Sequence, residues 1–167
     1  SNASGGANVI TASNSEPQNA LIPGDTNETG GGKVGQLLFA NLVRYDSKGD
    51  TKMEVADSIE PNKDATQYTV KLKDGWKFTD GTPVTAESFT KSWSYTANAK
   101  NAQKCSSFFS MIKGYDDLQK DGLKGDEQLE GLKVVDDKTF TVDLAQPDSV
   151  FPSKVGYLAF APLPESF

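Results

Sequence analysis

Apolar and polar residues alternate most clearly over residues 67–73, where Tyr68, Val70 and Leu72 are separated by polar side chains. This period of two predicts a strand that is buried on one face. A second alternation over 139–144 follows an apolar run at 132–135 and the turn-forming stretch 136–138, which together predict a β-hairpin. Shorter extended segments are expected at 8–12 and around 55–59, the latter ending near Pro61.

Helical spacing of apolar residues predicts three further elements. An amphipathic helix is expected over 33–44. A second helix should begin after Thr85 as N-cap, with Glu87 in its first turn and with Phe89 and Trp93 as its buried stripe. A helical patch is expected over roughly 105–120, with a stripe formed by Phe108, Phe109, Ile112, Tyr115 and Leu118.

Loops and turns separate these elements. A long loop rich in Ser, Asn, Pro and Gly is expected over 13–32, an acidic loop over 121–131, and a short helix or loop over 149–158. Helices and strands follow one another without strict βαβ alternation. The pattern therefore predicts an α/β fold with a mixed, largely antiparallel sheet and flanking helices.

Composition narrows the possible functions. The 167 residues carry 17 Lys and Arg against 23 Asp and Glu, a net charge of −6, which argues against nucleic-acid binding. The chain has no histidine and one cysteine, Cys105, so it has no internal disulfide, no Ser-His-Asp or Cys-His catalysis and no His-liganded zinc. The acidic run over 116–130 lacks the spacing of a calcium loop. We therefore expect a binding protein rather than an enzyme, with no cofactor and no metal.

The two ends of the chain carry signals of their own. Residues 1–3 look like the remnant of an expression tag, and residues 4–7 suit a flexible linker. The last eleven residues, 157–167, are apolar and include no basic residue, whereas terminal segments are usually polar. This pattern suggests a piece of a larger protein.

Residues 68–89, YTVKLKDGWKFTDGTPVTAESF, resemble the signature of the extracellular solute-binding proteins of family 5, the oligopeptide-, dipeptide- and nickel-binding components of ABC importers. Shorter matches occur in the same order elsewhere. They are the loop with Glu16-Pro17 and Pro23, the segment 38–43, the stretch 135–142, and residues 160–164. Three positions depart from the family pattern: Ile22 stands where an Asp is frequent, and Ala40-Asn41 replaces Glu-Gly.

The resemblance implies part of a two-lobe fold of the class II periplasmic-binding-protein type. Full members are about three times as long as this chain and carry a domain inserted early in the first lobe. On this reading, residues 8–32 form the first strand and ligand-side loop of lobe one. Residues 33–156 form the inserted α/β domain, and 157–167 begin the return to lobe one.

The resemblance also implies candidate ligand contacts. Counting without gaps places the loop that runs alongside a bound peptide at Asn27, Glu28 and Thr29, and a second wall at Cys105. Glu16 is a further candidate, for a peptide ammonium group. Each candidate has a structural alternative. Residues 27–29 could be a plain surface loop, Cys105 a small packed side chain, and Glu16 a carboxylate that fixes a turn. Aromatic residues such as Trp76, Phe78, Phe89 and Trp93 have the spacing of core residues.

By the same resemblance, the function is that of a monomeric receptor outside the cytoplasmic membrane. It would capture oligopeptides or dipeptides and deliver them to the permease of an ABC importer. A lipid anchor is expected, with a periplasmic form as the alternative, and the chain alone should bind peptide weakly. Two other functions are possible on the same sequence. The protein could be a family member that binds a nickel chelate, haem or an oligosaccharide, or it could be a cell-surface interaction module.

Overall fold

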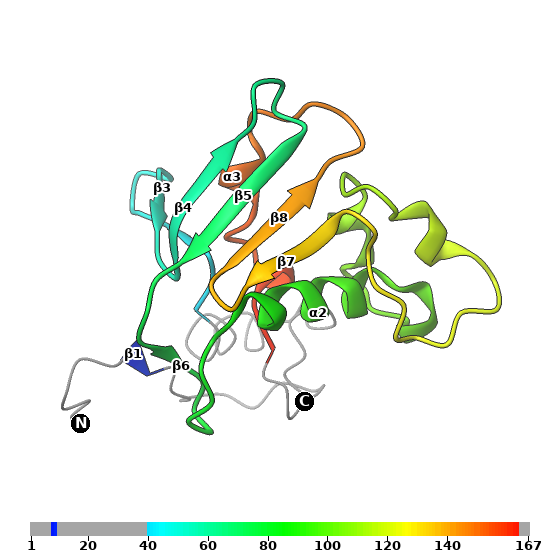
Figure 1. Cartoon of the computed structure of the whole chain (residues 1–167), viewed down its shortest axis with the longest axis horizontal. Coiled ribbons are helices and arrows are strands. Elements are labelled where there is room, and N and C mark those ends of the chain that lie inside the picture. Colours follow the sequence, from blue (N-terminus) through cyan, green and yellow to red (C-terminus); the bar gives the residue numbers. More distant parts are fainter. Residues whose placement is uncertain (1–7, 10–39, 164–167) are drawn as a thin grey trace.

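The structure is a computed structural model that describes residues 8–9 and 40–163. Its centre is a four-stranded antiparallel sheet in the order β4-β5-β8-β7 (Figure 1). The strands are β4 (Ala56–Pro61), β5 (Gln67–Leu72), β7 (Leu132–Asp136) and β8 (Thr139–Asp143). The predicted strand over 67–73 and the predicted hairpin are both present, so the mixed, largely antiparallel fold is confirmed.

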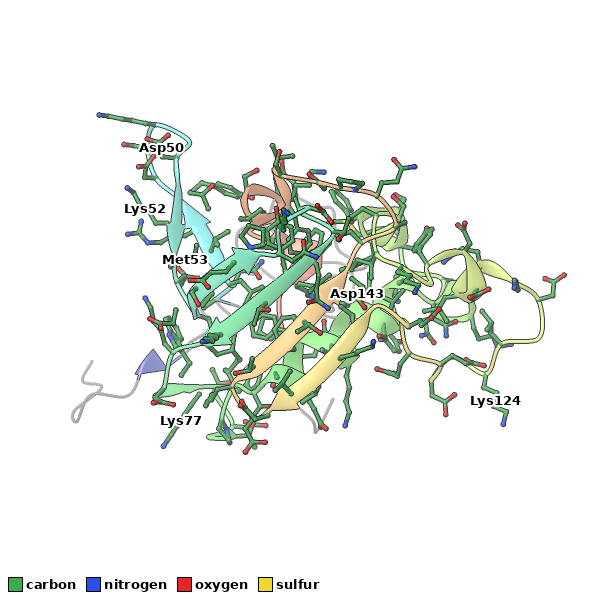
Figure 2. All side chains as sticks on the ribbon, turned by 45° about the horizontal axis from the view of Figure 1, so that its top comes forward. Asp50, Lys52, Met53, Lys77, Lys124 and Asp143 are labelled. Atoms are coloured by element: carbon green, nitrogen blue, oxygen red, sulfur yellow. The ribbon has the colours of Figure 1, made fainter. Side chains whose placement is uncertain are left out.

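One face of this sheet forms the core. The register sets Tyr68 opposite Val142 and Val70 opposite Phe140, and all four side chains are buried on the same side. The other side carries polar residues, among them Asp143, which points away from the helices in Figure 2. The alternation read from the sequence therefore gives a two-layer structure with the helices on one face only.

Helix α2 (Ala86–Ala97) covers the β7 side of that face (Figure 1). It begins where expected, with Thr85 as N-cap and Glu87 in the first turn. The Ser88 hydroxyl accepts a hydrogen bond from the backbone N–H of Thr85 at 3.0 Å. This N–H has no partner within the helix, so the Ser88 side chain satisfies it. Phe89 and Trp93 are fully buried, as their spacing predicted.

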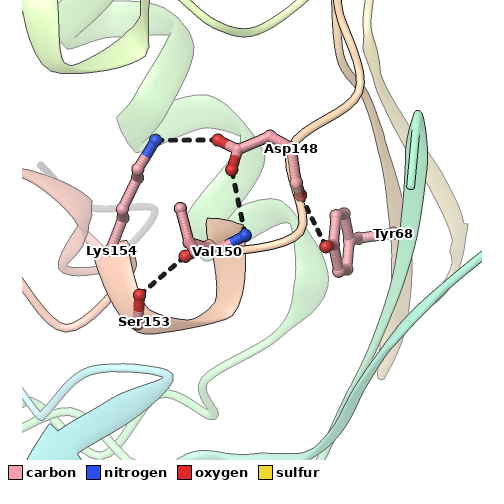
Figure 3. A network of polar contacts seen from close by, with 5 residues as sticks. All are labelled: Tyr68, Asp148, Val150, Ser153 and Lys154. Atoms are coloured by element: carbon pink, nitrogen blue, oxygen red, sulfur yellow. Dashed lines mark hydrogen bonds and ion pairs between the residues drawn. The ribbon is translucent and has the colours of Figure 1, made fainter.

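Helix α3 (Phe151–Lys154) covers the β5 side, inside the segment expected to be a short helix or loop. A polar network holds the connection between β8 and α3 to the sheet (Figure 3). The Tyr68 hydroxyl donates to the backbone carbonyl of Asp148 at 2.6 Å, and the Lys154 ammonium pairs with the Asp148 carboxylate at 2.7 Å. The same carboxylate caps the turn by accepting from the Val150 N–H at 3.0 Å.

The predicted helix over 33–44 is wrong at its described end. Residues 33–39 lie outside the described residues, but Val43–Tyr45 form strand β2, which pairs with β3 (Thr51–Met53). The Asp46 carboxylate accepts the N–H groups of Lys48 and Asp50 and so closes a tight turn. This turn brings β2 and β3 together as a two-stranded ribbon, which projects from the main sheet in Figure 2. The segment therefore forms a strand despite its helical spacing of apolar residues, because the turn pairs it with β3.

The predicted helix over 105–120 is also wrong. The segment forms two short 3₁₀ turns, η2 (Ser106–Phe109) and η3 (Asp116–Gln119), after a first turn η1 (Ala99–Asn101). Between them, Ile112 bridges to Leu144, and the Lys113 N–H donates to the carbonyl of Asp143 at 2.9 Å. Gly114 has a φ of +91°, a conformation that breaks a helix. Long-range pairing with the end of β8 therefore replaces the helix.

Two short strands lie apart from the main sheet. β1 (Asn8–Val9) pairs in parallel with β6 (Trp76–Lys77), and β1 falls in the extended segment expected at 8–12. Phe78 is buried and Trp76 is half-buried, so both contribute to the core as their spacing predicted. The loop expected over 13–32 lies outside the described residues.

The apolar stretch near the end of the chain lies along α2. The indole N–H of Trp93 donates to the carbonyl of Phe160, the last residue of η4 (Leu158–Phe160), at 2.7 Å, and the Ser92 hydroxyl donates to the Ala161 carbonyl at 2.8 Å. The Leu163 N–H donates to the Ser88 carbonyl at 3.1 Å. Residues 159–163 are therefore covered by the domain itself rather than exposed.

Candidate functional site

Four of the five predicted ligand contacts, Glu16, Asn27, Glu28 and Thr29, lie outside the described residues. The fifth, Cys105, immediately precedes η2 and is partly buried against the core. The Ser106 hydroxyl donates to the Ala97 carbonyl at 2.9 Å and fixes this turn to the end of α2. Cys105 thus sits where a small packed side chain fits, and its contact with a ligand stays a prediction.

An exposed aromatic patch consists of Tyr45, Phe108 and Tyr157. Their side chains are 37%, 43% and 49% exposed. The ring centroid of Tyr157 lies 5.8 Å from that of Tyr45 and 5.9 Å from that of Phe108, so the three rings form one surface drawn from three distant segments. The Tyr45 hydroxyl donates to the Ser153 carbonyl at 2.6 Å, which holds its ring beside α3.

Sequence reasoning missed this patch. It placed Phe108 and Phe109 together on the buried stripe of a helix. In the 3₁₀ turn the two side chains diverge, so that Phe109 is fully buried and Phe108 is exposed. The pair of adjacent aromatic residues could have signalled that one of them faces outward, but nothing in the sequence tells which.

A groove of about 860 Å³ runs beside α2 and β7. Its floor is apolar, from Leu132 and Val134 of β7 and from Leu163. Its walls carry hydroxyl groups and charges from α2, including Thr90 and the ion pair in which Lys91 lies 3.1 Å from Glu87. This groove is large enough for a small ligand or a short extended chain, because ligand sites in proteins measure roughly 300–1,000 Å³.

The loop at one end of the groove is fixed by Glu127. Its carboxylate accepts the backbone N–H of Lys124 at 2.9 Å, that of Gly125 at 2.8 Å, and the side-chain amide of Asn98 at 3.2 Å. These hydrogen bonds, chiefly those from the backbone of Lys124 and Gly125, lower the pKa of Glu127 from its ordinary 4.5 to about 2. The carboxylate therefore replaces the backbone partners that this loop lacks.

We expect the stabilising effect of Glu127 to depend on pH. A pKa that is lower in the folded state contributes stability fully above pH 4.5, and this contribution falls away between pH 4.5 and about 2. Glu127→Gln should be less stable than the parent chain at pH 7, and the gap should close towards pH 2. Urea unfolding at a series of pH values measures it. Glu60→Gln, an exposed residue of β4, serves as control. A gap that stays constant with pH would contradict the assignment.

Over residues 8–9 and 40–163, no three His, Cys, Asp or Glu side chains gather closely enough to hold a metal ion. None of the helices described there is long and apolar enough to cross a bilayer.

Comparison with known proteins decides the family. Residues 50–166 match the model of the bacterial extracellular solute-binding proteins, family 5, middle region. The chain belongs to this family. The oligopeptide-binding protein OppA of Bacillus subtilis is 30% identical over 146 residues, and the periplasmic OppA of Salmonella typhimurium is 35% identical over 135 residues. They cover 87% and 80% of this chain.

A third relative and a solved structure extend the comparison. The probable deoxycholate-binding periplasmic protein YgiS of Escherichia coli is 26% identical over 156 residues, 93% of this chain. The peptide-bound structure of Listeria monocytogenes OppA superposes on 97% of this chain with a TM-score of 0.77 and 29% identity, and the match covers 32% of that protein.

The chain spans only about a quarter of these curated relatives, with 26% of the B. subtilis OppA, 24% of the S. typhimurium OppA and 29% of YgiS covered. The family is one of solute-binding proteins rather than enzymes.

Proposed function

We propose that the chain is the N-terminal part of a receptor that captures short peptides for an ABC importer. The observation that carries this proposal is its similarity to several oligopeptide-binding proteins of one family, at 30–35% identity over most of the chain. The fold similarity to a peptide-bound OppA supports it. A receptor of this kind holds the ligand and passes it on, and it needs neither a nucleophile nor a cofactor.

The proposed peptide site combines two walls. The first is the loop with Asn27, Glu28 and Thr29, with Glu16 as a candidate for the peptide ammonium group. The second is the turn at Cys105, which α2 positions. Extended peptides are held largely through their backbone, and this gives affinity with little side-chain selectivity. Cys105 would then leave more room beside the ligand than a large aromatic residue could.

The division of the chain follows the same proposal. Residues 8–32 would belong to the first lobe, 33–156 to the inserted domain, and 157–167 to the return into the first lobe. The contacts of Phe160 and Ala161 with α2 fit this reading, because the return segment then forms part of the boundary of the inserted domain.

The proposed protein acts outside the cytoplasmic membrane, as a monomer that docks on its permease. A lipid anchor or a periplasmic location would serve this function equally. Relatives named as periplasmic proteins support the compartment in general terms.

A second candidate function is the binding of a non-peptide solute. The relative named as a probable deoxycholate-binding protein favours it, since that match covers 93% of this chain. A nickel chelate, haem or an oligosaccharide would be other ligands of this class. An independent interaction module on the cell surface is the remaining alternative.

Native mass spectrometry tests the proposal. The longer protein that contains residues 1–167 should be purified from a peptide-rich lysate and sprayed without denaturation. We expect a ladder of added masses that match short peptides, which unlabelled peptide of defined sequence should displace. A single added mass of another chemistry, or a folded protein with no added mass, would count against peptide capture.

A further inference from the structure

Asn41 links two segments that lie far apart in the sequence. Its side-chain amide nitrogen donates to the backbone carbonyl of Tyr157 at 2.7 Å, across 116 residues, and its side-chain oxygen accepts the N–H of Leu42 at 2.9 Å. The backbone N–H of Asn41 donates to the Glu54 carboxylate at 2.8 Å. The residue is only 6% exposed. A buried amide that is hydrogen-bonded at both ends keeps one orientation, because any other leaves a polar atom without a partner.

The segment around Tyr157 is held by this link and by Tyr45. The Tyr157 carbonyl also accepts the N–H of Phe160 at 2.9 Å, the hydrogen bond that forms η4. The side chain of Tyr157 is 49% exposed, so core packing does not fix its ring. The neighbouring Gly156 lies directly against Tyr45, since a Cβ added there would be 2.8 Å from two carbons of the Tyr45 ring. The segment that contains Asn41 and Tyr45 therefore determines where the Tyr157 ring lies.

The ring of Tyr157 in turn supports the turn η2. Its centroid lies 5.9 Å from that of Phe108, and the Phe108 ring also lies 6.4 Å from that of Phe160. Phe108 is 43% exposed, so these two rings supply much of its packing. The Phe108 N–H donates to the carbonyl of Cys105 at 3.1 Å, which couples the ring to the residue that precedes η2. The contacts thus run without a break from the amide of Asn41 to Cys105.

This link belongs to the sequence of this chain rather than to the family pattern. Asn41 stands where that pattern has glycine. Glycine has no side chain and could neither donate to the Tyr157 carbonyl nor accept the Leu42 N–H. A role for Asn41 is therefore not one that the resemblance implies.

We propose that Asn41 is a positioning residue for the peptide site: by holding Tyr157, it sets the place of Phe108 and so of the turn that carries Cys105. The inference rests on the proposed function, in which this turn is the second wall of the site. Asn41 would act through its neighbours and not by contact with the ligand. Its truncation should leave the domain folded but let the turn move, so that peptide binds less tightly although no ligand contact has been removed.

The first experiment needs no peptide. Cys105 is the one cysteine of the chain, and the rate at which its thiol reacts with a disulfide reagent reports how accessible the turn is. In residues 1–167, under native conditions, we expect Asn41→Ala to raise this rate at least about threefold, because the turn loses support. Asn41→Gly introduces the residue of the family pattern and serves as the second variant if Asn41→Ala does not fold.

Asn62→Ala is the matched control for both experiments. The Asn62 side chain also accepts backbone N–H groups, from Thr66 at 2.9 Å and Gln67 at 3.2 Å, but it does so between β4 and β5. Its truncation should lower the free energy of unfolding without changing the thiol rate. A general loosening of the domain is thereby separated from a movement of the turn.

The second experiment measures peptide affinity in the longer protein, by isothermal titration with one tripeptide. We expect Asn41→Ala to weaken binding about five- to tenfold, and Asn62→Ala to leave it unchanged. The effect of Asn41→Ala should be largely absent when Phe108 is already replaced by Ala, because both changes act on the same turn. A double-mutant cycle measures this non-additivity.

Each experiment has its own contrary result. An unchanged thiol rate in both Asn41 variants would overturn the positioning role. A faster thiol with unchanged peptide affinity, or fully additive effects in the cycle, would overturn the connection between this turn and the peptide site. If the parent longer protein bound no peptide at all, the proposed function would fail by itself, and the thiol rates would still decide whether Asn41 positions the turn.

Discussion

Trp93→Ala should remove a large part of the stability of this domain. The Trp93 ring is fully buried and lies 5.2 Å from the ring centroid of Phe160, 5.6 Å from that of Phe140 and 5.9 Å from that of Phe109. Truncating a buried aromatic residue costs about 3–5 kcal/mol. Domains have only about 5–15 kcal/mol in total, so a large fraction of the molecules should unfold under mild denaturant.

The substitution acts on two layers at once. The sheet contributes Phe140, and the covered segment near the chain end contributes Phe160, whose carbonyl accepts the indole N–H at 2.7 Å. Trp93→Ala therefore leaves a cavity and a carbonyl without its donor. Trp93→Phe keeps most of the ring volume and loses the hydrogen bond, and we expect it to cost about 1–3 kcal/mol.

Urea unfolding followed by circular dichroism measures both variants. Val150→Ala is the control, since Val150 is exposed and its truncation should change the free energy of unfolding by less than about 0.5 kcal/mol. If Trp93→Ala lost less than about 1 kcal/mol, or no more than Trp93→Phe, the ring would not join the two layers as described.

The elements that sequence reasoning predicted correctly are those with strong local signals. The alternation around Val70 and the turn before Thr139 specify a strand and a hairpin through neighbouring residues alone. Helix α2 was predicted with its correct N-cap because Thr85 and the spacing of Phe89 and Trp93 are also local features.

The wrong predictions concern segments whose structure depends on distant partners. Residues 105–120 have helical spacing, but pairing of Ile112 with Leu144 and the positive φ of Gly114 determine their conformation. Neither is visible in a local window. The aromatic patch was missed for the same reason, because it depends on which segments meet in space. The prediction of a helix over 33–44 was wrong at its described end because the turn at Asp46 pairs β2 with β3.

The candidate ligand residues came from a resemblance rather than from local patterns. Family membership confirms the resemblance itself. The assignment of the loop at 27–29 depends on an ungapped count through a region without periodic signal, and Cys105 depends on a similar count. Glu16 was chosen only because a carboxylate can pair with a peptide ammonium group. In such regions loop length, and not the hydrophobic pattern, decides which side chain reaches a ligand.

We expect the isolated 167 residues to bind peptide at least about 100-fold more weakly than the longer protein. Binding sites usually bury about 70–90% of the surface of a small ligand, and this chain covers about a quarter of its relatives. The part of the site contributed by these 167 residues would leave much of the peptide surface exposed to water. The resemblance implies that the carboxylate pairing with the peptide ammonium group lies in the rest of the longer protein, with Glu16 as the alternative. Removing one partner of a buried charge pair costs about 3–5 kcal/mol, equivalent to about 10²–10⁴-fold in affinity.

Isothermal titration of both proteins with the same tripeptide measures this difference. The isolated chain must first show a cooperative unfolding transition, so that weak binding is not mistaken for loss of fold; the burial of Trp93 and Phe160 within the described residues leads us to expect one. Cys105→Ala in the longer protein is a matched variant, and a change in its affinity would support the second wall. Affinities within tenfold of each other for the isolated chain and the longer protein would contradict the two-lobe proposal, because the 167 residues would then contain the whole site.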